Sequence, residues 1–99
     1  IGDCFATTCA PYITDAIERT IGGFGYAVAR NKPFAGGFTT RHYGQPRDGV
    51  HTVQIEINRA LYMDELNISK NANFDRVAAQ MTDVVAALAH LTAQDLAAE

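Results

Sequence analysis

The sequence predicts an α/β fold in which helices pack on a small sheet, and three observations support this class. Two segments, roughly 11–21 and 74–91, repeat apolar residues at the spacing of an amphipathic helix. Segment 50–57 alternates apolar and polar residues, as a half-buried strand does. A shorter alternating segment, 26–30, is the second strand candidate. In chain order these elements run helix, strand, loop, strand, helix, which favours helices layered on a sheet.

The ends of both helices carry recognisable signals. Pro11 follows hydroxyl side chains, and proline is favoured in the first turn of a helix. Gly22 and Gly23 are expected to end this helix. Asn73 is the predicted N-cap of the second helix. The apolar stripe of that second helix consists of Phe74, Val77, Ala78, Met81, Val84, Val85, Leu88 and Leu91.

Between the two predicted strands, residues 31–49 are expected to form a loop. They include four Gly and two Pro, which disfavour regular structure. Loops of this length inside a compact domain are usually functional or disordered. Three aromatic residues, two Arg and one His argue against disorder. We therefore interpret 31–49 as an ordered binding loop, and 59–66 as an ambiguous stretch with a helical turn.

Composition excludes several classes of function. The net charge is -3 and no Lys/Arg cluster exists, so no nucleic-acid partner is expected. No apolar run approaches the ~20 residues of a membrane span. The first residues do not form a signal peptide, and the initiator Met is absent. We expect a cytoplasmic protein, whose chain begins inside a longer protein or after processing. Cys4 and Cys9 are expected to be reduced thiols, with a disulfide or a nucleophile as alternatives.

The polar face of segment 50–57 is the first candidate site. Thr52, Gln54, Glu56 and Asn58 share this face, and Val53, Ile55 and Ile57 share the other. A carboxylate on a strand beside a binding loop is suited to act as a general base, which makes Glu56 the catalytic candidate. The alternative is a solvated face of an edge strand.

Arginine is the preferred side chain for bidentate carboxylate binding, so Arg41 is the candidate clamp, with an ordinary surface arginine as the alternative. Thr39 and Thr40 precede it and supply further donors. We count His51 among the candidate substrate-binding residues, although its parity on the strand favours a packed or hydrogen-bonded side chain. His42 and His51 lack the spacing of a zinc site, and no metal ligand is assigned within the chain.

Four motifs give the sequence a close resemblance to a known family. N-x-P-F-x-G-G, T-R-x-Y-G-x-P, G-V-H-x-x-Q-I-E and L-Y-M-D-E begin at residues 31, 40, 49 and 61, respectively. Together they resemble the N-formylglutamate amidohydrolase family, and the resemblance covers almost the whole chain.

The resemblance implies a mixed sheet flanked by helices, as in zinc carboxypeptidases, of which residues 1–99 would be the C-terminal portion. The N-terminal portion with the zinc ligands would be absent from this chain, and the chain alone would be inactive. The implied activity is hydrolysis of N-formyl-L-glutamate to formate and L-glutamate, in histidine degradation. Glu56 matches the family's general base, and Arg41, supported by Thr39 or Thr40, would bind a substrate carboxylate.

Two alternatives remain open at this stage. A related zinc amidohydrolase could act on another N-acyl amino acid, because a carboxylate clamp serves all such substrates. A non-catalytic fragment could instead bind a small acid or a partner chain.

Overall fold

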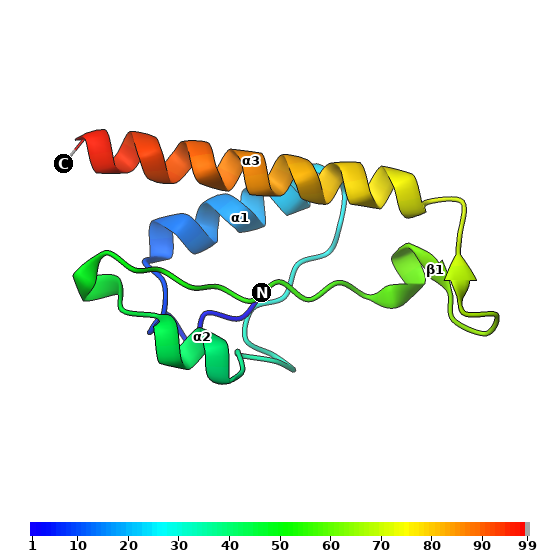
Figure 1. Cartoon of the computed structure of the whole chain (residues 1–99), viewed down its shortest axis with the longest axis horizontal. Coiled ribbons are helices and arrows are strands. Elements are labelled where there is room, and N and C mark those ends of the chain that lie inside the picture. The colour runs from blue at the N-terminus through cyan, green and yellow to red at the C-terminus, as the bar shows by residue number, and fades with distance from the viewer. Residues whose placement is uncertain (99) are drawn as a thin grey trace.

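The structure, a computed structural model, describes residues 1–98, and the side chains of residues 1–91. The long helix α3 (Phe74–Ala98) lies across α1 (Pro11–Gly23), and the extended segment 50–57 runs beneath them (Figure 1). The molecule measures 47 × 26 × 19 Å. Its longest dimension follows α3, whose 25 residues span about 38 Å at the helical rise of roughly 1.5 Å per residue.

Helix α1 is confirmed, and it ends at Gly23, within the predicted stop signal and two residues beyond the expected bound of 21. The helix runs through Gly22 and Gly23, and its last carbonyls accept hydrogen bonds from the N–H groups of Phe24 and Gly25. Gly25 has φ +96°, a left-handed conformation that glycine adopts without a steric penalty. The helix therefore ends within the predicted glycine pair, and the chain turns away from it at Gly25, where the backbone needs glycine.

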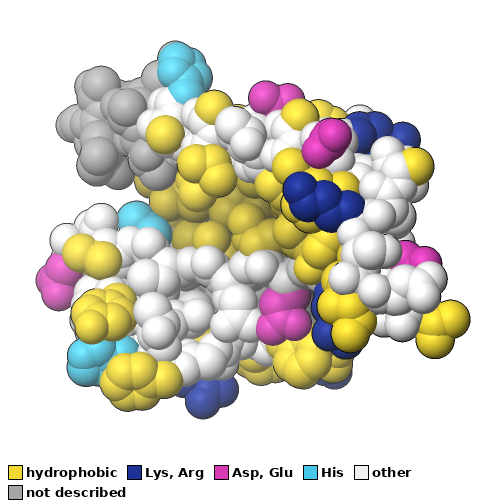
Figure 2. Space-filling view, turned by 45° about the vertical axis from the view of Figure 1, so that its right-hand side comes forward, with side chains coloured by type: hydrophobic (Ala, Val, Ile, Leu, Met, Phe, Trp, Pro, Cys, Tyr) yellow, Lys and Arg dark blue, Asp and Glu magenta, His cyan; other side chains and the backbone are white. Residues whose placement is uncertain are grey.

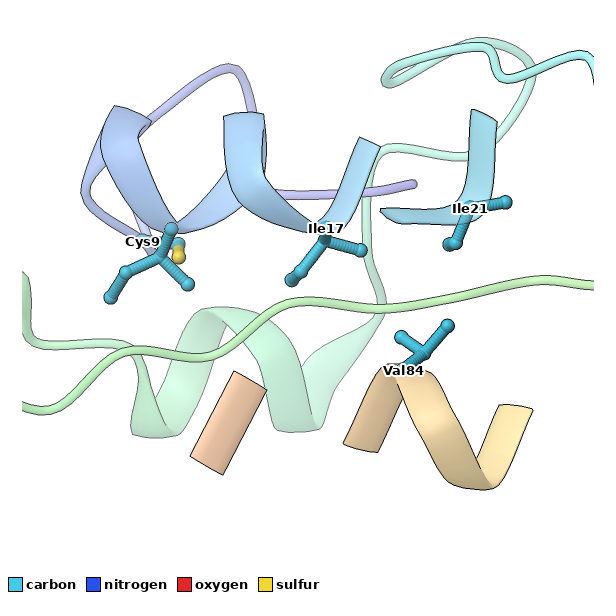
Figure 3. Close-up of a cluster of buried hydrophobic side chains, with 5 residues drawn as sticks. Cys9, Ile17, Ile21 and Val84 are labelled. Atoms are coloured by element: carbon cyan, nitrogen blue, oxygen red, sulfur yellow. The ribbon is translucent and has the colours of Figure 1, made fainter. Parts of the chain in front are cut away.

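The core lies between α1 and α3. Ile13, Ile17 and Ile21 of α1 are buried, and Figure 3 shows Ile17 and Ile21 pointing toward Val84 of α3. Val77 of α3 is also buried. Burying such aliphatic side chains stabilises the fold by about 1.5–3 kcal/mol each.

Helix α3 extends beyond the predicted 74–91, and its buried stripe is narrower than predicted. Val77 and Val84 are buried, with Met81 and Leu88 packed partly between them and α1. Val85, by contrast, is 66% exposed. Ala78 is exposed as well. Contact with a single helix covers only a seam with alternating steps of three and four residues, so the outer members of the predicted stripe face away from α1.

The two predicted strands are extended but do not form ladders. Gly2 and Gln54 exchange two antiparallel hydrogen bonds of 2.8 Å. Ile1 donates to the carbonyl oxygen of Ala29 and accepts from the amide of Asn31, which is the pattern of parallel neighbours. The first residues thus lie between 26–31 and 50–57, as the middle of a rudimentary mixed sheet.

A regular β-strand needs consecutive pairs of hydrogen-bonded residues. Among the described residues, the contact of Gly2 with Gln54 and that of Ile1 with 29–31 are each a single such pair. The predicted strands 26–30 and 50–57 are therefore wrong as regular elements. The fold is a mixed helix and strand arrangement, with antiparallel β1 (Met63–Asp64) and β2 (Ser69–Lys70) as its named strands. This hairpin, to the right in Figure 1, was not predicted.

The predicted loop 31–49 also contains regular structure. It includes the helix α2 (Phe38–Tyr43) and the 3-10 helix η1 (Pro46–Asp48). The expected helical turn within 59–66 is η2 (Arg59–Leu61), and that prediction is confirmed. Gly44 ends α2 where the backbone packs tightly, because a Cβ there would lie 2.5 Å from the Cβ of Thr8. Glycine in this segment thus permits close packing and does not indicate an unstructured loop.

A buried carboxylate organises the N-terminal turn. Asp3 accepts hydrogen bonds from the Thr14 hydroxyl, the Asn31 side-chain amide and the backbone amide of Ala6. Residues 4–6 all have left-handed backbone conformations, which cost about 1–2 kcal/mol per non-glycine residue. Burial alone would raise the pKa of Asp3, but these three hydrogen bonds, with the Arg30 charge, hold that pKa below its usual value. The charged form of Asp3 therefore supports a strained turn.

Candidate functional site

The candidate site forms where α2 packs on the polar side of segment 50–57. The Thr52 hydroxyl donates to the carbonyl oxygen of Thr40, at 2.6 Å. The side-chain carbonyl of Gln54 accepts from the backbone amide of Gly37, at 3.0 Å, just before α2 begins. Two side chains of one segment thus hold both the entry and the middle of this short helix.

Glu56 lies on the same side of the segment as Gln54. Its carboxylate is exposed and accepts a hydrogen bond from the Gln54 side-chain amide. Val53 and Ile55, at the intervening positions, pack against the core. The predicted alternation of faces is confirmed, although the segment is not a regular strand. Glu56 is therefore an accessible carboxylate whose orientation is fixed by a neighbour.

The three candidate residues of α2 have different environments. Thr40 is buried, and its carbonyl is occupied by Thr52. Thr39 and Arg41 are exposed. Of the two threonines proposed to support Arg41, only Thr39 is accessible to a ligand. The clamp role of Arg41 stays a prediction, because an exposed guanidinium fits a substrate clamp and a surface arginine equally well.

His51 is half-buried and serves the N-terminal end of α1. Its Nδ1 accepts a hydrogen bond of 3.0 Å from the backbone amide of Ala10, the residue that precedes the helix. An acceptor Nδ1 assigns the imidazole proton to Nε2. The structure thus supports the prediction, made from the position of His51 on the apolar side of 50–57, that its side chain is packed or hydrogen-bonded. Its substrate-binding role stays a prediction, and Nε2 is the atom that would carry it.

A hollow in the described part of the molecule lies beside Glu56 and not beside α2. It has a volume of about 420 Å³ and is lined by Val77 and Met81 of α3, by parts of 26–34, and by 55–58. Figure 2 shows hydrophobic side chains gathered in this hollow beneath α3. Arg41 does not line it. The hollow is therefore mainly an apolar surface, with Glu56 at its margin.

The described residues contain no cluster of metal-ligating side chains, and both cysteines are buried. Among the described side chains, those of residues 1–91, no group of three or more His, Cys, Asp or Glu could hold a metal ion. Cys4 and Cys9 are both free and buried, as expected for reduced thiols. Burial raises the pKa of the Cys9 thiol, which makes it a poor nucleophile. None of the described helices is long and apolar enough to cross a membrane.

Gln54 is the site residue that sequence reasoning missed. The alternation of 50–57 places it among several polar residues on one face and predicts no role of its own for it. An amide two positions from a carboxylate on one extended segment lies on the same side, within reach of it. That spacing was the available signal, but the contact to Gly37 depends on the unpredicted helix α2.

Comparison with known proteins gives consistent matches. Residues 1–63 match the family described as N-formylglutamate amidohydrolase. Two curated relatives are named N-formylglutamate deformylase. The Pseudomonas aeruginosa protein is 39% identical and the Pseudomonas putida protein 33% identical, each over 66 residues that make up 66% of this chain and 25% of the relative. The crystal structure of N-formylglutamate amidohydrolase from Ralstonia eutropha JMP134 superposes with a TM-score of 0.78 at 34% identity, covering 94% of this chain and 32% of that one. The chain thus spans about a quarter of the length of the curated relatives that it matches.

Proposed function

The chain belongs to the N-formylglutamate amidohydrolase family, and from this premise we propose that its parent protein hydrolyses N-formyl-L-glutamate to formate and L-glutamate. The observation that carries the proposal is the hydrogen-bonded link from Glu56 through Gln54 to α2, the helix that bears Arg41. This link joins a candidate base to a candidate carboxylate clamp. The deformylase names of the Pseudomonas relatives support the same reaction.

In the proposed mechanism, Glu56 acts as the general base. Its carboxylate takes a proton from the water that attacks the formyl carbon. As the C–N bond breaks, Glu56 returns that proton to the leaving nitrogen, so that formate and the free amine of glutamate are the products. Exposure makes the carboxylate accessible to water, and the Gln54 amide fixes one of its oxygens.

Arg41 is proposed to bind a carboxylate of the substrate. Its fork of N–H donors matches a carboxylate in two parallel hydrogen bonds, which a lysine ammonium cannot reproduce. Thr39 is the exposed neighbour that would add a donor. A product with two carboxylates makes such a clamp chemically reasonable. Nε2 of His51 is the further donor assigned to the substrate.

The zinc expected from the family resemblance is part of the proposal, with ligands outside these residues. The described donors do not fit a metal site, so these residues are proposed only to bind the substrate and to transfer the proton. A zinc-carboxypeptidase-like mixed sheet, a role in histidine degradation and a cytoplasmic location are proposed on the same resemblance.

Residues 1–99 are proposed to be the C-terminal portion of one amidohydrolase domain. The apolar hollow beneath α3 and the single-pair contacts of 26–31 and 50–57 support this, since the remainder of a longer relative would cover that surface. Exposed apolar patches and open strand edges promote association. We therefore expect residues 1–99 alone to self-associate in analytical ultracentrifugation. A soluble monomer that melts cooperatively would contradict this division of the domain.

The activity is tested on the full-length parent protein. Formate and free glutamate are measured with N-formyl-L-glutamate and with an N-acetyl-L-glutamate control. We expect stoichiometric release of both products from the formyl substrate and slower release of glutamate from the acetyl substrate. Failure to release formate would overturn the proposed activity, and equal turnover of both substrates would favour a broader N-acyl amino acid hydrolase.

A further inference from the structure

We propose that Gln54 is a positioning residue that fixes the carboxylate of Glu56 relative to the substrate-binding helix α2. The inference rests on the proposed function, because it assigns Glu56 as the base. Its basis is that the Gln54 side chain forms hydrogen bonds with both parts of the site: it accepts from Gly37 at the start of α2 and donates to Glu56.

Backbone hydrogen bonds hold Gln54 in place independently of its side chain. Its N–H and C=O both pair with Gly2, at 2.8 Å. Gly2 lies next to Ile1, which pairs with 29–31, so Gln54 is hydrogen-bonded to the middle segment of the extended layer. The side chain therefore extends from one of the best-supported positions of segment 50–57.

The oxygen and the nitrogen of the Gln54 side-chain amide form hydrogen bonds with different partners. Its oxygen accepts from the Gly37 amide at 3.0 Å, with the Thr40 hydroxyl at 3.5 Å as a weaker second donor. Its nitrogen donates to Oε1 of Glu56. The opposite orientation of the amide would place N–H against N–H at Gly37 and oxygen against the carboxylate, so the two partners together determine which way the amide points.

The hydrogen bond from Gln54 has a chemical consequence at Glu56. Because Oε1 accepts from Gln54, Oε2 is the carboxylate oxygen that is left to accept the proton from water in the proposed mechanism. The same amide ties that oxygen to the start of α2, and therefore to Arg41 further along the helix. Of the ordinary side chains of this length, only glutamine accepts on one arm and donates on the other while remaining uncharged.

In the full-length protein, the hydrogen bond to Glu56 can be removed alone or together with the hydrogen bond from Gly37. Gln54→Glu keeps an acceptor for Gly37 but loses the donor to Glu56. Gln54→Met, similar in length, loses both arms. Thr52→Val is the matched control, because Thr52 also holds α2 through the Thr40 carbonyl but does not touch Glu56.

We expect Gln54→Glu to lower kcat by about tenfold or more, measured at saturating substrate, because the base is no longer oriented. Gln54→Met should lower kcat by a similar factor and also raise KM, since the helix entry is released. Thr52→Val should raise KM while kcat stays within about twofold. Circular dichroism melting curves of all three variants verify that they fold.

Wild-type kcat in a folded Gln54→Glu variant would overturn the inference and leave the proposed function intact. The same holds if Gln54→Glu and Thr52→Val change kcat and KM in the same proportion, because that pattern describes a residue that only supports the fold. If the wild-type enzyme releases no formate, the proposed function fails, and the inference fails with it. Activity of the wild-type enzyme therefore separates the two failures.

Discussion

Helices α1 and α3 meet through aliphatic side chains, whereas α2 and segment 50–57 meet through hydrogen bonds. Ile17 packs toward Val84 in the first region, and Gln54 reaches Gly37 and Glu56 in the second. Apolar burial is non-directional and proportional to area, while hydrogen bonds depend on geometry. The comparison indicates that the helical region contributes mainly stability, and that the polar region fixes the geometry of the site.

The sharpest test of this division is Glu56→Gln in the parent enzyme. Glutamine cannot accept the proton, and general bases contribute about a hundredfold to ten-thousandfold in rate. We expect kcat to fall by at least roughly a hundredfold, with an unchanged melting temperature.

Glu65→Gln is the matched control, because Glu65 is also an exposed carboxylate but forms a surface ion pair with Arg59. It should retain wild-type kcat. Metal content is the second control. Loss of zinc from Glu56→Gln would make Glu56 a ligand, and retained activity would place the base elsewhere.

The opposite behaviour is expected from Ile17→Ala. Ile17 is buried between α1 and α3, and truncating such a residue leaves a cavity that costs about 2–5 kcal/mol. Denaturant unfolding of the parent protein should report this loss, with kcat per folded molecule unchanged. Val85→Ala, on the exposed side of α3, should cost less than about 0.5 kcal/mol. Equal losses in both variants would contradict the assigned core.

The same division explains which features the sequence could predict. Both long helices follow from local periodicity, because their buried faces are set by spacing along the chain. The predicted strand 50–57 had the correct faces but no ladder, because strand pairing depends on neighbours distant in sequence. Gly2 and Gln54 are an example, as are Thr8 and Thr52, which lie 44 residues apart.

Within the site, individual candidate residues could be predicted from the sequence, but the contacts between them could not. Glu56 and Arg41 could be singled out by chemistry and by family motifs. Helix α2 could not, because four glycines in 31–49 indicated a loop and the side chains that hold the helix come from 50–57. The role of Gln54 depended on that helix and was missed for the same reason.

Arg41→Lys should have a smaller effect than either change above. The ammonium keeps the charge but loses the bidentate geometry, so we expect KM to rise by about tenfold with little change in kcat. Arg47→Lys, at another exposed arginine in 31–49, should leave KM unchanged. Similar KM values for the wild type and both variants would return Arg41 to the class of surface arginines.

The smallest effect expected is the pH dependence contributed by Asp3, which belongs to neither region alone because it joins Thr14 of α1 to Asn31 of the extended layer. Its pKa is lower in the folded protein than in the unfolded chain, so the unfolded state binds the proton more tightly. The stabilisation is therefore fully present above the unfolded pKa and is lost as the pH falls through the folded pKa. Asp3→Asn removes this titration, since an amide stays neutral, and also removes a charged acceptor from the turn at residues 4–6. The variant should be less stable at pH 7 by about 1–2 kcal/mol, as expected for weakened hydrogen bonds to a buried charge. Its stability should also change less than that of the wild type between pH 5 and pH 3, in urea unfolding of the parent protein at each pH. Parallel pH profiles for the two proteins would show that the Asp3 charge does not support the turn, and that the connection between α1 and Asn31 depends on packing instead.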